Sequence, residues 1–205
     1  MAMSRFDDLI ETRQKGRTMV QNWFSVAALV LVSAGLVSCA GEAPKPSVPS
    51  SAISLPKSTS PEDEAARAAM AAYELYWQIS EQAGRAPREK DWRSELAKAM
   101  ADPALTDYVN EVANLASVPA HTVGRYGRSP KTTSVSLGRP PRVVITDCLD
   151  ATDEHLVSDK AGETGRNLDN PDQPRRYEFE AQVVRYPDPD RWLVQQVQPR
   201  LEKPC

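Results

Sequence analysis

The sequence predicts an α+β fold for most of the chain, and a change of pattern near Pro119 supports this prediction. Between residues 60 and 119 apolar side chains recur at helical spacing, whereas after Pro119 they alternate with polar ones. A period near 3.6 residues indicates amphipathic helices, and a period of two indicates strands with one buried face. We therefore expect three helices that pack on one strongly curved, mostly antiparallel sheet, which the strands after them form.

The first helix is predicted to begin at Pro61 and to end at Gly84. Ser60 can cap it, Pro61 suits the first helical position, and the acidic residues 62–64 favour the positive end of the helix dipole. Its apolar stripe is Ala66, Met70, Tyr73 and Trp77. A second helix is expected over residues 88–101, with Trp92, Leu96 and Met100 on one stripe.

The third helix should follow Asp102-Pro103 and end before Pro119. Six strands are then expected, near residues 121–126, 133–137, 142–150, 154–159, 177–186 and 191–199. In the fifth, Tyr177, Phe179, Ala181 and Val183 alternate with polar residues, as in a sheet with one packed face and one solvated face. The charged stretch 153–176 is expected to form a solvated loop.

The N-terminal region has the features of an export signal. Basic residues precede an uncharged apolar run from about Trp23 to Val37, which is too short to cross a bilayer comfortably. The run ends in Leu36-Val37-Ser38-Cys39, which resembles the lipobox of bacterial lipoproteins. The resemblance implies that residues 1–38 are a signal peptide and that Cys39 is acylated, so that a lipid anchor holds the protein on the extracytoplasmic face of the cell membrane. An uncleaved signal anchor or a buried apolar helix are the alternatives.

Residues 39–60 are predicted to be a tether, and residues 61–205 the single folded domain. Four prolines lie between Ala43 and Ser60 among Ser, Ala and Lys, a composition that cannot bury enough apolar surface to fold. The first 38 residues carry four basic and three acidic side chains, which leaves the rest of the chain near −4. That charge provides no basic surface for nucleic acid.

The two cysteines after Cys39 are predicted to form a disulfide. Cys148 lies in a predicted strand and Cys205 is the last residue, and outside the cytosol such a pair is normally oxidised. The alternative is two free thiols. In the oxidised case Cys148 cannot act as a nucleophile with His155.

The order of elements and several short motifs resemble the NTF2-like cone fold, and in particular uncharacterised NTF2-like lipoproteins of actinobacteria and actinophages. The motifs are a Tyr-x-x-Tyr-Trp segment at 73–77, Asp147-Cys148-Leu149-Asp150, an arginine pair followed by Val-Val at 175–184, and Arg-Trp-x-Val at 191–194. The resemblance implies a fold and a location but no reaction, because this fold serves many functions.

No catalytic, metal or cofactor site is predicted. The two histidines lie in no nucleophile motif, and the acids Asp147, Asp150, Asp153 and Glu154 lack an EF-hand pattern, so they are expected to solvate a strand end rather than bind calcium. If the cone is hollow, its pocket residues should be Tyr73, Tyr76, Trp77, Asp147 and Asp150. Strand alternation lets only one of the two aspartates face the interior, and the aromatic residues can equally be core.

The function expected from these observations is binding or scaffolding by a lipid-anchored domain in the cell envelope. Its partner should be another envelope or secreted protein, or a small apolar ligand. Two alternatives remain open: a phage- or prophage-encoded surface lipoprotein that excludes later phages, and an isomerase- or dehydratase-type enzyme with an aspartate base and a tyrosine acid.

Overall fold

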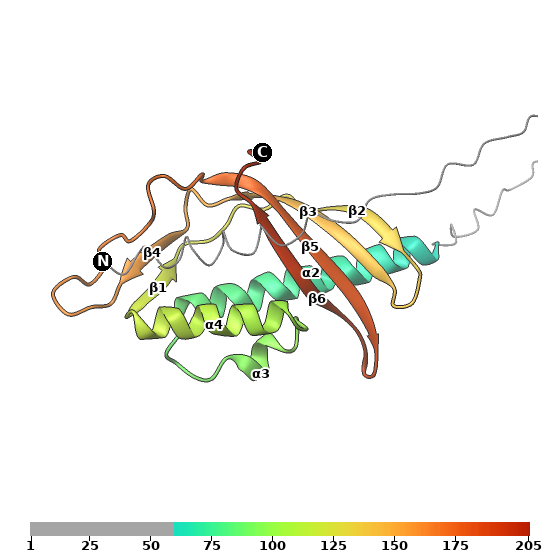
Figure 1. Ribbon diagram of the computed structural model, residues 1–205, viewed down its shortest axis with the longest axis horizontal. Coiled ribbons are helices and arrows are strands. Elements are labelled where there is room, and N and C mark those ends of the chain that lie inside the picture. The colour runs from blue at the N-terminus through green and yellow to red at the C-terminus, as the bar shows by residue number, and fades with distance from the viewer. Residues whose placement is uncertain (1–59) are drawn as a thin grey trace, which may run out of the picture. The chain divides into compact units, whose positions relative to one another are not determined.

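The computed structural model describes residues 60–205, in which three helices precede six strands (Figure 1). The predicted signal peptide, Cys39 and all of the tether except Ser60 lie outside the described residues. The helices are α2 (Pro61–Arg85), α3 (Arg93–Leu96) and α4 (Ala104–Ser117). The strands are β1 (Ala120–Val123), β2 (Lys131–Ser136), β3 (Arg142–Asp150), β4 (His155–Ser158), β5 (Arg176–Pro187) and β6 (Asp190–Arg200). The α+β prediction is confirmed.

Helix α2 begins where the sequence predicts, because a capping box fixes its first turn. The Asp63 N–H donates to Ser60 Oγ at 3.1 Å, and the Ser60 N–H donates to the Asp63 carboxylate at 3.4 Å. These two bonds satisfy main-chain donors that a helix start otherwise leaves free. The helix continues one residue beyond Gly84, to Arg85.

The prediction of a helix over residues 88–101 is wrong, because only Arg93–Leu96 is helical. After Leu96 the chain continues in turns to Met100 and then pairs with β6: the Val194 N–H donates to the Ala99 carbonyl and the Ala101 N–H donates to the Val194 carbonyl, both at 2.9 Å. The predicted stripe is nevertheless buried, since Trp92, Leu96 and Met100 are at most 5% exposed. Periodicity therefore predicted the packing of this segment and missed its backbone path.

The strands form two antiparallel sheets in the described part of the chain, and not the one sheet that we expected. The larger has the order β2-β3-β5-β6, and the smaller pairs β1 with β4. The chain bends between the two at Gly124, which has a φ of 81° and where a Cβ would lie 1.7 Å from the Asp153 carbonyl oxygen. Only glycine fits this bend, which ends pairing in one sheet before β2 joins the other.

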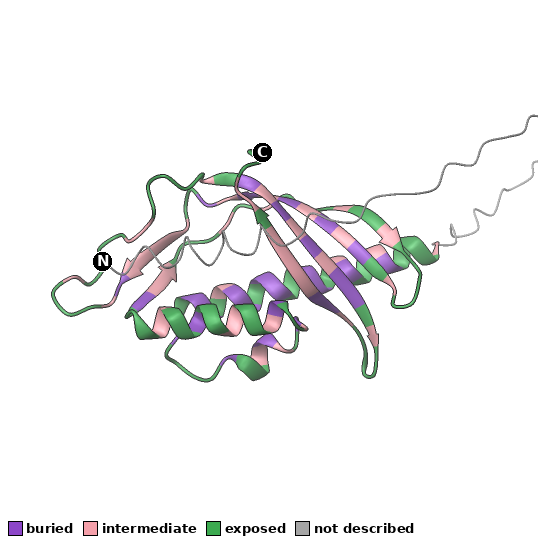
Figure 2. Cartoon of the chain, in the orientation of Figure 1, coloured by how far each residue is buried: buried purple, intermediate pink, exposed green. Residues whose placement is uncertain are grey.

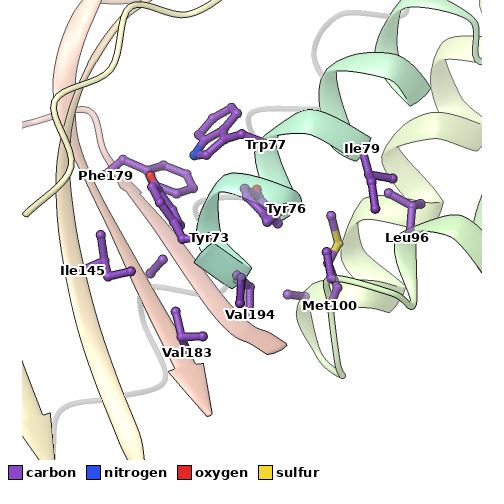
Figure 3. Packing of buried hydrophobic residues seen from close by; sticks show 14 of the residues in the cluster. Tyr73, Tyr76, Trp77, Ile79, Leu96, Met100, Ile145, Phe179, Val183 and Val194 are labelled. Atoms are coloured by element: carbon purple, nitrogen blue, oxygen red, sulfur yellow. The ribbon is translucent and has the colours of Figure 1, made fainter. Parts of the chain in front are cut away.

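The hydrophobic core lies between α2 and one face of the larger sheet (Figures 2 and 3). Alternate residues of β5 are buried as predicted, from Tyr177 to Val183, and face Val143, Ile145 and Leu149 of β3. Helix α4 packs against α2, β1 and β6. Among the helices of this part of the chain, none combines the length and apolar character needed to cross a membrane.

The predicted Cys148–Cys205 disulfide is present, with the two Cα atoms 5.7 Å apart. Cys148 lies on the face of β3 opposite the core, where it alternates with the buried Asp147 and Leu149. The C-terminal segment crosses the end of the sheet, and the Glu178 N–H donates to the Lys203 carbonyl at 2.9 Å. The bond thus fixes the chain terminus to the central strands.

Candidate functional site

A buried carboxylate lies at the centre of the fold, in contact with a tyrosine. Asp147 is 1% exposed, and its Oδ2 accepts a hydrogen bond from the Tyr73 hydroxyl at 2.9 Å. Its Oδ1 accepts from the Ser129 N–H at 2.6 Å. Strand alternation places Asp147 with Val143 and Ile145 on the core face, whereas Asp150 lies on the other face, 3.5 Å from the Arg176 guanidinium. The structure thus selects Asp147 as the inward-facing aspartate.

Burial raises the pKa of Asp147, while the bonds from Ser129 and Tyr73 and the charge of Arg128 oppose this shift. Burial also raises the pKa of Tyr73, which keeps the phenol protonated as the donor. Arg128 forms an ion pair with Glu74 at 2.8 Å and lies over the Trp77 ring, 5.7 Å from its centroid. The hydrogen bonds from Tyr73 and Ser129 thus occupy both carboxylate oxygens of Asp147.

The aromatic residues that we assigned to a pocket belong mainly to the core. Tyr73, Tyr76 and Trp77 surround Phe179 of β5, with ring centroids 5.3 to 6.5 Å from the Phe179 ring (Figure 3). Of the five predicted pocket residues, only Trp77 also lines the cavity described next. The sequence left open whether these aromatic side chains line a pocket or form the core, and their burial places them in the core.

A small cavity, of about 50 Å³, lies beside the C-terminal half of α2, next to α4 and the residues after β1. Its aromatic walls are Trp77, Tyr108 and Tyr126, and the Trp77 and Tyr126 ring centroids are 5.1 Å apart. Three carboxylates line it as well: Glu81, which is paired with Arg85, and Glu111 and Glu154. We call this cavity, with its three aromatic residues, Glu111, Glu154 and Ser80, the tyrosine pocket.

Both Glu111 and Glu154 have a raised pKa in the tyrosine pocket. Burial raises the pKa of Glu154, and a hydrogen bond from Tyr126 opposes the shift. Glu111 is exposed overall, but its carboxyl group borders the pocket rings, and this partial desolvation together with the charge of Glu154 raises its pKa. Burial, followed by the charges of Glu154 and Glu111, also raises the pKa of Tyr177 to about 12.

Sequence reasoning missed most of this pocket. Glu154 was expected to solvate a strand end, and Tyr108 and Glu111 lie on the third predicted helix without a motif. Residues three apart lie on one face of a helix, so Tyr108 and Glu111 share a face, but only the fold shows that this face meets Tyr126 and Glu154. No local signal in the sequence could have joined these segments.

Each of the two histidines contacts an aspartate, on the smaller sheet and its loop. His121 Nδ1 lies 2.8 Å from Asp159, which also contacts Arg88, and His155 Nδ1 lies 2.7 Å from Asp169. The predicted solvated loop is thus partly held in place, since Asp169 also accepts the Leu156 N–H at 2.8 Å. Between residues 60 and 205, no three His, Cys, Asp or Glu side chains come together as metal ligands would.

Comparisons with known proteins do not name a family. No protein-family model matches the chain, and no curated protein matches it. A solved structure with a similar backbone is the crystal structure of the intermembrane space region of the chloroplast protein ARC6, with a TM-score of 0.48 and 15% sequence identity, over 65% of this chain and 95% of that one. Similarity at this level leaves the function of the domain to be argued from its own residues.

Proposed function

We propose that the protein is a lipid-anchored lipoprotein on the extracytoplasmic face of a bacterial membrane, whose folded domain acts by binding or scaffolding. The observation that carries the proposal is the Cys148–Cys205 disulfide. Structural disulfides form and persist outside the reducing cytosol. The bond therefore agrees with the export that the lipobox-like segment ending at Cys39 predicts.

We also propose that residues 61–205 are an NTF2-like cone domain related to the lipoproteins of actinobacteria and actinophages. Three helices followed by antiparallel strands support this assignment. So do the positions of two motifs: Asp147-Cys148-Leu149-Asp150 ends β3, and Tyr73 to Trp77 forms the part of α2 that packs on the sheet.

The location is tested by labelling in an actinobacterium. Cells that express the full chain or its Cys39→Ala variant are grown with a palmitate analogue, and the labelled protein is measured in the membrane fraction. We expect label on the unaltered chain alone, because Cys39 is the acceptor. Equal labelling of both proteins, or of neither, would contradict the anchor.

Binding is favoured over turnover by the way the interior is filled. The carboxylate–tyrosine pair that an isomerase would use is Asp147 and Tyr73; these groups contact each other, and Asp147 is 1% exposed. A catalytic base must reach a substrate proton directly or through one water. An isomerase- or dehydratase-type enzyme is the second candidate, and the raised pKa of Asp147 is the observation that favours it.

The partner is sought by crosslinking on intact cells. A membrane-impermeant crosslinker is applied to cells carrying the full chain or the unanchored Cys39→Ala variant, and attached proteins are identified by mass spectrometry. A binding domain should capture the same protein repeatedly in the anchored form. Recovery of the uncrosslinked chain alone would count against a protein partner.

A further inference from the structure

The tyrosine pocket contains polar groups that the fold leaves unused. Ser80 is 1% exposed and lines the pocket, yet its Oγ has no hydrogen-bond partner among the residues that the structure describes. Buried hydroxyls are normally hydrogen-bonded, so an unused one that borders a cavity indicates a missing partner. Glu111 and Glu154 form no ion pair within residues 60–205.

The positive charges near the pocket do not neutralise both carboxylates. Arg85 lies 2.9 Å from Glu81 and donates to the Gly124 carbonyl at 2.8 Å, so its guanidinium is already engaged. Arg175 donates to main-chain oxygens and lies 3.2 Å from Asp169. Arg125 is exposed and is the remaining cation in the lining. When Glu111 and Glu154 are both ionised, one of their negative charges is left without a cation among the described residues of the lining.

We propose that the tyrosine pocket binds a primary alkylammonium ion, carried by a free aliphatic amine or by a lysine side chain of a partner. A primary ammonium has three N–H donors, and the carboxylates of Glu111 and Glu154 supply acceptors for them; the Ser80 hydroxyl beside them is closed to solvent and has no partner within hydrogen-bond distance in residues 60–205. Trp77, Tyr108 and Tyr126 supply ring faces that attract a cation.

The size of the pocket fits this ligand. At roughly 10–15 Å³ for each water-sized group, 50 Å³ accommodates about four heavy atoms, which is the end of an alkylammonium chain. A bulky quaternary ammonium exceeds this space and has no N–H to donate.

The pocket lies toward the end of α2 that is remote from Ser60, where the tether of the proposed function joins the domain. The tether joins α2 at Ser60, whereas the pocket is lined by the last turns of α2, from Trp77 to Arg85. A 25-residue helix is about 37 Å long, so much of that length separates the tether from the pocket.

The test is calorimetric titration of the full chain, in detergent micelles, with n-butylammonium chloride. We expect saturable binding of n-butylammonium. We expect no binding of n-butyrate, which has the opposite charge, or of tetrapropylammonium, which is larger. Glu154→Gln and Glu111→Gln should each weaken binding by about tenfold or more. Glu202→Gln, which alters an exposed carboxylate outside the pocket lining, should leave the affinity for n-butylammonium unchanged. The amide of Nα-acetyl-lysine, titrated in parallel, binds more tightly than n-butylammonium if the natural ligand is a lysine side chain, and more weakly if it is a free amine.

Two results would overturn the inference: no saturable heat at millimolar n-butylammonium, or unaltered affinity in both Gln variants. The circular dichroism spectrum of each variant shows whether it is folded. Should Glu154→Gln not fold, the exposed Glu111 and a Ser80→Ala variant provide the same comparison. Palmitate labelling at Cys39 is independent of this titration, so failure of one leaves the other interpretable.

Discussion

The disulfide allows the sharpest quantitative prediction about this domain. Cys148 and Cys205 are 57 positions apart, so their bond closes a loop of 58 residues. In the chain-entropy model a loop of that length stabilises the folded state by about 4 kcal/mol, through restriction of the unfolded chain. Cys148 is half-buried on the outer face of the sheet and Cys205 is exposed. Replacing both by serine therefore removes little core packing, and the loop term should dominate.

We expect the free energy of unfolding of the Cys148→Ser/Cys205→Ser double variant to be lower than that of the unaltered chain by most of this loop term of about 4 kcal/mol. With a denaturant slope of about 2 kcal/mol per molar urea, the midpoint should fall by about 2 M. Urea unfolding followed by tryptophan fluorescence measures it. The matched control is the unaltered chain in a reducing agent, which should unfold at the midpoint of the double variant. If the oxidised chain, the reduced chain and the variant share one midpoint, the bond does not restrain the chain as described.

Three further predictions concern single residues. Gly124→Ala should destabilise the domain by several kcal/mol in the same urea assay, because the added Cβ would overlap the Asp153 carbonyl. Gly162 has the same φ of 81° but nothing within 4 Å of an added Cβ, so Gly162→Ala should cost only about 1 kcal/mol. Equal losses at the two sites would contradict the close approach at Gly124. Tyr73→Phe should reduce the free energy of unfolding by about 1.5–3 kcal/mol, since it removes the donor to a buried carboxylate, and an unchanged midpoint would argue against that bond. Because the pKa of Asp147 is raised, the folded state binds a proton at this carboxyl more readily than the unfolded state does. The contribution of Asp147 to the free energy of unfolding should therefore fall as the pH rises from the ordinary pKa of 3.8 to the raised native one. Asp147→Asn should abolish this part of the pH dependence of stability, and identical pH profiles for the variant and the unaltered chain would show that Asp147 does not titrate in this way.

The sequence predicted those elements whose signals are local. Ser60, Pro61 and the acidic residues 62–64 marked the start of α2. Alternation along β3 gave its bounds, residues 142–150, because one face of that strand is buried. Alternation also showed that only one aspartate could face the core, but choosing Asp147 over Asp150 required the fold.

What could not be predicted depends on contacts between distant segments. The chain after Leu96 leaves the helix because Ala99 and Ala101 pair with Val194, nearly a hundred residues away. Such tertiary pairing overrides helix propensity, which is a weak preference. The tyrosine pocket has the same origin, since α4 supplies Glu111 and the segment before β4 supplies Glu154.

Mass spectrometry of the protein recovered from membranes tests whether Cys39 is the anchor. We expect an N-terminal peptide that begins at Cys39 and carries a diacylglyceryl group, with no peptide that spans Ser38 and Cys39. An intact peptide across Ser38–Cys39 with an unmodified cysteine would contradict it.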